Sequence, residues 1–121
     1  MYENKNIVVF GVSGDASKYG HKIFKTLLAK GLHVFGVNPK GGEVLGQTLF
    51  VNLASLPVRP DVAIMVIPPA ALPQAVSQCE QAGVKEIWFQ PGAQSAQAYN
   101  QAVRAGMEAV ESCFMADNGF W

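Results

Sequence analysis

Short apolar runs recur along the chain and are rich in Val and Ile. The four clearest runs are Ile7–Phe10, Val34–Val37, Val62–Ile67 and Ile87–Phe89. Because polar residues do not alternate with apolar ones inside them, these runs are typical of strands buried on both faces, as in a parallel sheet. Met107–Val110 predicts a last strand, and Gln47–Phe50 predicts a further short one.

The segments between these runs have apolar residues at helical spacing. The three sets are Ile23, Phe24, Leu27 and Leu28; Leu72, Ala75, Val76 and Cys79; and Ala96, Tyr99 and Val103. Each segment ends on a glycine suited to a left-handed C-cap, at Gly31, Gly83 and Gly106. Alternating strands and helices predict an α/β fold, Rossmann-like and doubly wound, with a mostly parallel sheet of five to six strands and helices on both faces. The segment 41–60 breaks this rhythm, and we expect an irregular crossover there.

Composition narrows the class of protein. A chain of 121 residues that is 50% apolar can build one core, so we expect a single domain over residues 1–121. Nine Lys and Arg balance nine Asp and Glu, which argues against a nucleic-acid partner. Cys79 and Cys113 lie far apart, without metal-ligand spacing, as expected in a reducing cytosol. No apolar run is long enough to predict a membrane span, and we expect a soluble cytoplasmic protein.

A glycine-rich loop follows the first predicted strand and leads into the first predicted helix. It reads Gly11-Val12-Ser13-Gly14-Asp15-Ala16-Ser17-Lys18-Tyr19-Gly20. In a Rossmann fold this loop binds a diphosphate, because glycines allow close approach and the helix N-terminus attracts anions. Ser13, Ser17 and Lys18 would add side-chain donors. The spacing is not that of the dinucleotide fingerprint, and a tight turn with a serine cap is the alternative.

The end of the second predicted strand bears on the choice of nucleotide. Domains that bind NAD usually place Asp or Glu there, whereas this chain has Asn38-Pro39-Lys40. A neutral amide and a cation favour a ribose that carries an extra phosphate, as in coenzyme A and NADP. The alternative is a β-turn without a ligand, for which Asn-Pro-Lys-Gly-Gly is good chemistry.

Two further strand ends carry Pro68-Pro69 and Gln90-Pro91-Gly92. The carboxyl ends of parallel strands form the ligand crevice of an open α/β sheet. The sequence therefore predicts that the loops 11–20, 38–42, 68–70 and 90–93 converge. Pro69 also suits the first turn of a helix, which is its structural alternative.

Taken in chain order, these motifs resemble the CoA-binding domain family, specifically its short single-domain bacterial members. The motifs are Gly11-Val12-Ser13, Lys18-Tyr19-Gly20, Val37-Asn38-Pro39-Lys40-Gly41, Pro68-Pro69 and Gln90-Pro91-Gly92. The likeness spans nearly the whole chain and extends to the N-terminal part of the succinyl-CoA synthetase alpha subunit. It implies that Gly11, Ser13, Lys18 and Tyr19 face the diphosphate, Asn38 and Lys40 the adenosine end, and Pro68 and Pro69 the cleft wall.

The resemblance implies non-catalytic binding of coenzyme A or an acyl-CoA, by a carrier, sensor or accessory module. We expect no counterpart of the synthetase domain that carries the phosphorylated histidine, and His21 and His33 are interpreted as packing or surface residues. Cys113 beside Phe114 is interpreted as a small buried hydrophobe. We therefore assign no catalytic or metal-binding residue, although enzymatic activity stays open.

Two other functions remain as alternatives. One is an NADP- or NAD-dependent oxidoreductase-like domain, which would need a second domain for its substrate. The other is a regulatory domain that has lost its ligand. The apolar tail with Phe114, Met115, Phe120 and Trp121 either pairs two copies into a homodimer or folds back onto its own core.

Overall fold

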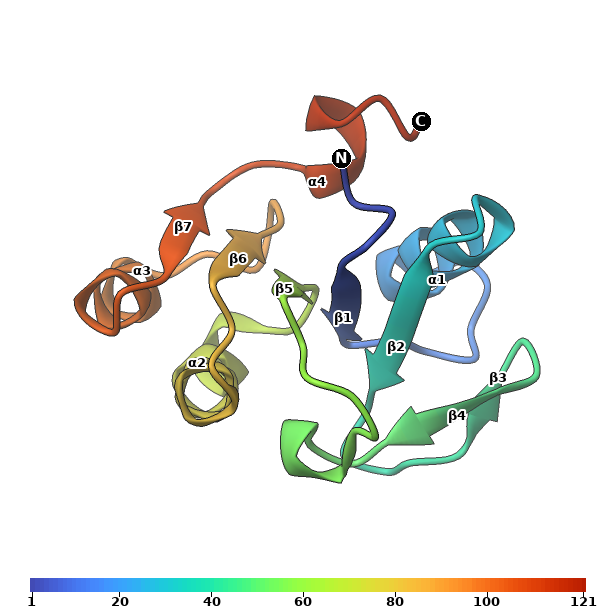
Figure 1. Ribbon diagram of the computed structural model, residues 1–121, viewed down its shortest axis with the longest axis horizontal. Coiled ribbons are helices and arrows are strands. Elements are labelled where there is room, and N and C mark those ends of the chain that lie inside the picture. The colour runs from blue at the N-terminus through green and yellow to red at the C-terminus, as the bar shows by residue number, and fades with distance from the viewer.

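The computed structural model describes residues 1–121 as one sheet with helices on both sides (Figure 1). The strands are β1 (Asn6–Phe10), β2 (His33–Val37), β3 (Glu43–Val44), β4 (Gln47–Phe50), β5 (Val62–Met65), β6 (Glu86–Phe89) and β7 (Glu108–Val110). The helices are α1 (Tyr19–Ala29), α2 (Leu72–Ala82), α3 (Ala96–Arg104) and α4 (Phe114–Asp117), with 3₁₀ turns η1 (Leu53–Ser55) and η2 (Pro69–Ala71).

The strand order in the sheet is β3-β4-β2-β1-β5-β6-β7. All neighbouring strands are parallel except β3, which is antiparallel to β4. The predicted α/β, doubly wound and mostly parallel sheet is confirmed, but it has seven strands rather than five to six. The extra strand lies in the segment 41–60, where the chain folds into a hairpin at Leu45-Gly46 instead of staying irregular.

The two faces of the sheet build two separate cores. Consecutive β1 residues alternate between them, so that Val8 packs on the side of α2 and α3 while Val9 packs on the side of α1 and α4. Figure 1 shows these helix pairs on opposite sides of the sheet. Because both faces are covered, the central strands lack polar alternation, which confirms the sequence interpretation.

The helices end where the sequence predicts. Gly31, Gly83 and Gly106 follow α1, α2 and α3 and have φ angles of 74°, 77° and 87°. Such positive φ angles are available to glycine without a steric cost, so these glycines mark the helix ends. None of the helices combines the length and the apolar character that crossing a membrane requires.

The C-terminal tail folds back onto the core. Phe114 and Met115 are fully buried, and Phe120 stacks on Phe114 with a centroid separation of 5.8 Å. Trp121 is the one exposed ring of the tail, with 51% of its surface accessible. Three of the four tail residues, Phe114, Met115 and Phe120, therefore pack on the protein's own core. Pairing of two copies through the tail would depend on Trp121.

Candidate functional site

The loop after β1 passes directly against the loop after β5. Gly11 has a φ angle of 98°, and a Cβ atom placed on it would lie 2.1 Å from the backbone oxygen of Val66. The Gly11 N–H donates to the carbonyl of Val37 at 3.1 Å, which also ties this loop to the end of β2. No other residue type fits this position, because the approach and the positive φ both exclude a side chain.

The N-terminus of α1 is open to a ligand. Gly20 lies in its first turn, where an added Cβ would be 2.0 Å from the Gly11 oxygen. The backbone N–H groups of Tyr19, Gly20 and His21 donate to no acceptor in the protein, and Lys18 at the N-cap supplies no side-chain cap. Three free donors and the positive end of the helix dipole therefore face the same space, which suits an anion.

Hydrogen bonds inside the loop hold its shape. His21 Nδ1 donates to the Ser13 carbonyl at 2.8 Å, and the Asp15 N–H donates to Ser13 Oγ at 3.0 Å. The Ser17 hydroxyl and N–H both donate to Asp15 Oδ1, at 2.7 and 2.9 Å, and these bonds hold the pKa of Asp15 below its usual range. The hydroxyl hydrogen of Ser17 is thus committed to Asp15, whereas that of Ser13 stays free.

Asn38 joins three segments at the end of β2. Its Nδ2 donates to the Val12 carbonyl at 2.9 Å, its Oδ1 accepts the Lys40 N–H at 2.9 Å, and its own N–H donates to the Phe50 carbonyl. The predicted turn chemistry is present, because the Lys40 bond closes an Asx turn. The same side chain also ties the glycine-rich loop to the end of β2, so the turn and this loop are connected through Asn38.

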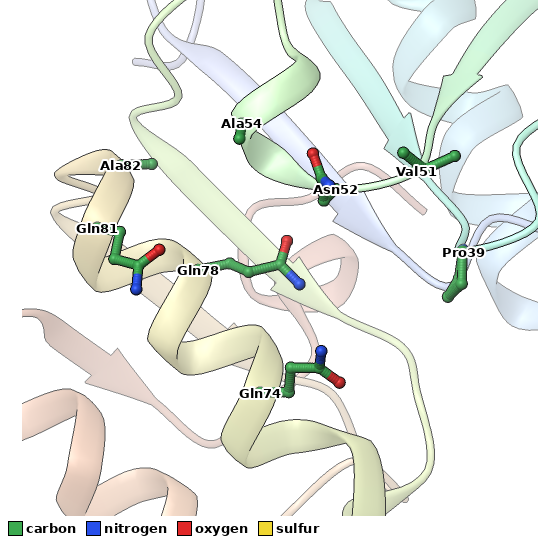
Figure 2. A pocket seen from close by; sticks show the side chains of 8 residues that line it. All are labelled: Pro39, Val51, Asn52, Ala54, Gln74, Gln78, Gln81 and Ala82. Atoms are coloured by element: carbon green, nitrogen blue, oxygen red, sulfur yellow. The ribbon is translucent and has the colours of Figure 1, made fainter.

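A groove runs from this edge along the α2 face of the sheet. It consists of two adjoining cavities, of about 460 and 90 Å³, which share Pro39, Val51, Gln74 and Gln78. The smaller cavity reaches Gly11, and the larger extends down α2 to Ala82. Figure 2 shows Gln74 and Gln78 extending from α2 toward the segment after β4.

A second cavity lies at the same edge on the side of α1 and α4. It has a volume of about 160 Å³ and is lined by Tyr19, Val66, Gln90, Pro91, Cys113 and Trp121. Gln90 accepts the Phe114 N–H at 2.7 Å, and Cys113 Sγ accepts the Ala116 N–H at 3.4 Å. Cys113 is half-buried and its sulfur caps α4, so it is less buried than its interpretation as a small buried hydrophobe implied.

The predicted site residues follow β1, β2, β5 and β6, and their loops lie along one edge because these strands are neighbours. Gly11 and Pro39 line the groove, and Tyr19 and Gln90 line the second cavity. The Val12 side chain is fully buried and lines neither cavity. The exposed predicted residues that line neither cavity are Gly14, Ser17, Lys18, Lys40, Pro68, Pro69 and Gly92.

Sequence reasoning missed the groove residues that come from α2 and from the segment after β4. These are Val51, Asn52, Gln74 and Gln78. The repeat of glutamine at 74, 78 and 81 was a usable signal, because that spacing puts all three on one helix face. No cluster of three His, Cys, Asp or Glu side chains is placed to hold a metal ion.

Comparisons with known proteins agree on one domain type. The family model described as "CoA binding domain" matches residues 5–119. The alpha subunit of acetate–CoA ligase [ADP-forming] I from Pyrococcus furiosus is 31% identical over 93 residues, covering 72% of this chain and 20% of that protein. The chain thus spans about a fifth of the length of this curated relative.

Solved structures show the same fold over almost the whole chain. A conserved hypothetical protein from Pyrococcus furiosus has a TM-score of 0.86 and 36% identity, covering 93% of this chain and 98% of its own. A hypothetical protein from Pyrococcus horikoshii OT3 has a TM-score of 0.90 and 28% identity, covering 95% and 82%. These relatives are archaeal, so they do not support the predicted likeness to bacterial members in particular.

Proposed function

This chain belongs to the CoA-binding domain family, and from that premise we propose that it binds coenzyme A, free or as an acyl-CoA, at the carboxyl edge of its sheet. The observation that carries the proposal is the open N-terminus of α1 beside Gly11, from which the groove departs. Coenzyme A combines a diphosphate with a flat base and a long arm. The edge offers an anion site with a cavity on either side of it.

The diphosphate is assigned to the start of α1. The N–H groups of Tyr19, Gly20 and His21 would donate to its oxygens, and the hydroxyl of Ser13 is free to add one bond. Lys18 is exposed at the N-cap and would supply a counter-charge. Ser17 contributes indirectly, because its hydroxyl holds Asp15.

The adenosine is assigned to the end of β2. Pro39 lines the groove, and the neighbouring Lys40 would meet the ribose phosphate that coenzyme A carries. NADP carries a phosphate on its ribose too, but the family match supports coenzyme A and lends NADP no support.

The pantetheine arm is assigned to the loops after β5 and β6. Pro68 and Pro69 would form the exposed wall along which the arm runs, and Gln90 and Gly92 follow the next strand. The second cavity then lies at the far end of the arm, beyond β5.

The proposed role is binding without catalysis, as a carrier, sensor or accessory module. The His21 Nδ1 atom donates to the Ser13 carbonyl, and the Cys113 sulfur accepts the Ala116 N–H at the start of α4. Neither side chain is therefore placed to act as a nucleophile or a base. The acetate–CoA ligase relative is about five times longer than the matched region, and its activity is not assigned to this chain. We also propose a cytoplasmic location, because free cysteines suit a reducing compartment.

Thermal melting with a panel of nucleotides tests this function. A ligand that binds only the folded protein raises the melting temperature by mass action, by an amount set by its concentration relative to Kd. Coenzyme A and acetyl-CoA should raise it strongly and dephospho-CoA less, while NADP and NAD at equal concentration should not. A protein stabilised by NADP and not by coenzyme A would contradict the proposal.

A further inference from the structure

The cavity beside α4 has no charged residue in its lining. Its lining residues are Tyr19, Val66, Gln90, Pro91, Cys113 and Trp121, and four of these six are hydrophobic. A carboxylate or phosphate that entered this space would lose hydration without meeting a counter-charge, which is unfavourable. The cavity therefore suits an uncharged and mostly apolar group.

The volume of the cavity limits the size of that group. It measures about 160 Å³. An apolar protein cavity of about 150 Å³ accommodates benzene, which has six non-hydrogen atoms. The cavity beside α4 therefore has room for a group of about six non-hydrogen atoms and not for a long chain.

Two exposed aromatic rings border this cavity. The ring centroids of Tyr19 and Trp121 lie 6.3 Å apart, and the two residues are 66% and 51% exposed. Covering such large rings with an apolar group removes their surface from water, which is favourable. Because Tyr19 is the first residue of α1, this aromatic wall adjoins the helix N-terminus to which the diphosphate is assigned.

One polar side chain in the lining is held in place and keeps a free hydrogen. Gln90 is buried, its Oε1 accepts the Phe114 N–H at 2.7 Å, and its Nε2 donates to Cys113 Sγ at 3.5 Å. An amide nitrogen carries two hydrogens, and the second one on Gln90 has no acceptor in the protein. Gln90 therefore has one hydrogen to donate to the carbonyl oxygen of a ligand.

Resting on the function proposed above, we propose that this cavity holds the acyl group of an acyl-CoA, and that the chain prefers short, uncharged acyl groups. The pantetheine arm is assigned to the loops after β5 and β6, and Val66, Gln90 and Pro91 from those loops line the cavity. The thioester at the end of the arm places its carbonyl oxygen at the free hydrogen of Gln90. The alkyl part packs against Val66 and the two rings.

Calorimetry with CoA esters that differ in length and charge tests this assignment. Each buried methylene group raises affinity up to about fourfold, so butyryl-CoA, with two more methylenes, should bind about tenfold more tightly than acetyl-CoA. Octanoyl-CoA should bind no more tightly than butyryl-CoA, because its chain exceeds the cavity. Malonyl-CoA is similar in size to butyryl-CoA but ends in a carboxylate, so it should bind about tenfold more weakly than butyryl-CoA.

Two variants change the cavity in opposite directions. Trp121→Ala removes one wall and Val66→Phe fills the space, so each should bring butyryl-CoA and acetyl-CoA to nearly equal affinity. Val103→Ala and Val103→Phe are the matched controls, because Val103 is exposed on α3 and lines none of the cavities described; both should keep the preference. If Val66→Phe lowers the melting temperature without ligand, Trp121→Ala decides, since its ring is exposed.

The outcomes separate this inference from the proposed function. If the wild type binds acetyl-CoA and butyryl-CoA equally, or Trp121→Ala keeps the wild-type preference, the acyl assignment is overturned and coenzyme A binding stands. An affinity that keeps rising from butyryl-CoA to octanoyl-CoA, or equal binding of malonyl-CoA and butyryl-CoA, overturns the preference for short, uncharged groups. If the wild type binds neither coenzyme A nor any ester, the proposed function fails and the acyl assignment fails with it.

Discussion

The groove along α2 and the cavity beside α4 lie at the same edge of one sheet, yet their chemistry differs. The larger cavity of the groove has a volume of about 460 Å³, and its polar side chains are amides. The cavity holds about 160 Å³ and is lined by the rings of Tyr19 and Trp121 together with Cys113. A parallel sheet thus presents two unlike sites at the edge where its strands end.

The difference follows from the direction in which each loop leaves the sheet. The loop after β1 turns into α1 on one face, while the loop after β5 turns into α2 on the other. Gly11 lines the groove and Val66 lines the cavity, so their close contact is the boundary between the two sites. The proposed ligand would cross this boundary, with its base on the amide side.

Gly11→Ala should disrupt the contact between Gly11 and Val66 and have the largest effect on stability. The added Cβ would lie 2.1 Å from the Val66 oxygen at a positive φ, so we expect a loss of roughly 3 kcal/mol in the free energy of unfolding. Urea denaturation measures it. Gly14→Ala in the same loop is the control, because its Cβ would meet nothing within 4 Å. Equal stability of the two variants would contradict the contact.

Asn38→Ala should weaken the structure only on the groove side of the edge, at the end of β2. It removes the bond to the Val12 carbonyl and the acceptor for the Lys40 N–H, at a cost of about 1–2 kcal/mol in stability. Coenzyme A affinity should fall as well, because the glycine-rich loop loses its tie to β2. Thermal unfolding and calorimetry report the two effects. Asn100→Ala, on the exposed side of α3, should leave both unchanged.

Lys40→Ala should separate coenzyme A from dephospho-CoA. Because Lys40 is exposed, its attraction to the ribose phosphate is screened, and we expect about 1 kcal/mol, or roughly fivefold in affinity. The preference for coenzyme A should shrink in the variant and in the wild type at high salt. Calorimetry at two ionic strengths checks this, with Lys25→Ala on exposed α1 as the control. A preference that survives in Lys40→Ala would remove this residue from the site.

The two cysteines should differ in reactivity, and this is the smallest effect. Burial raises the pKa of the Cys79 thiol to about 12, whereas Cys113 lines the cavity. Iodoacetamide at pH 8 should modify one thiol of the folded protein, identified by mass spectrometry, and none in Cys113→Ser. The neutral Cys79 stabilises the fold fully below about pH 9, and that contribution falls as the pH rises toward 12.

Local sequence patterns determined the strands and helices and the sheet edge along which the predicted site residues lie. The Val- and Ile-rich runs are the buried strands, Gly31, Gly83 and Gly106 end the helices, and Asn38 makes the predicted turn. These features depend on backbone preferences and on neighbours a few residues away, which a sequence shows directly.

Only the tertiary structure decided which polar groups are free to bind a ligand. Ser17 was predicted as a donor, but its hydroxyl is taken by Asp15, while Gln74 was not predicted and stands free in the groove. The bond from Leu53 to Gln78 spans 25 residues and the one from Asn38 to Val12 spans 26. A side chain's free donors depend on such distant partners, and folding alone brings those partners together.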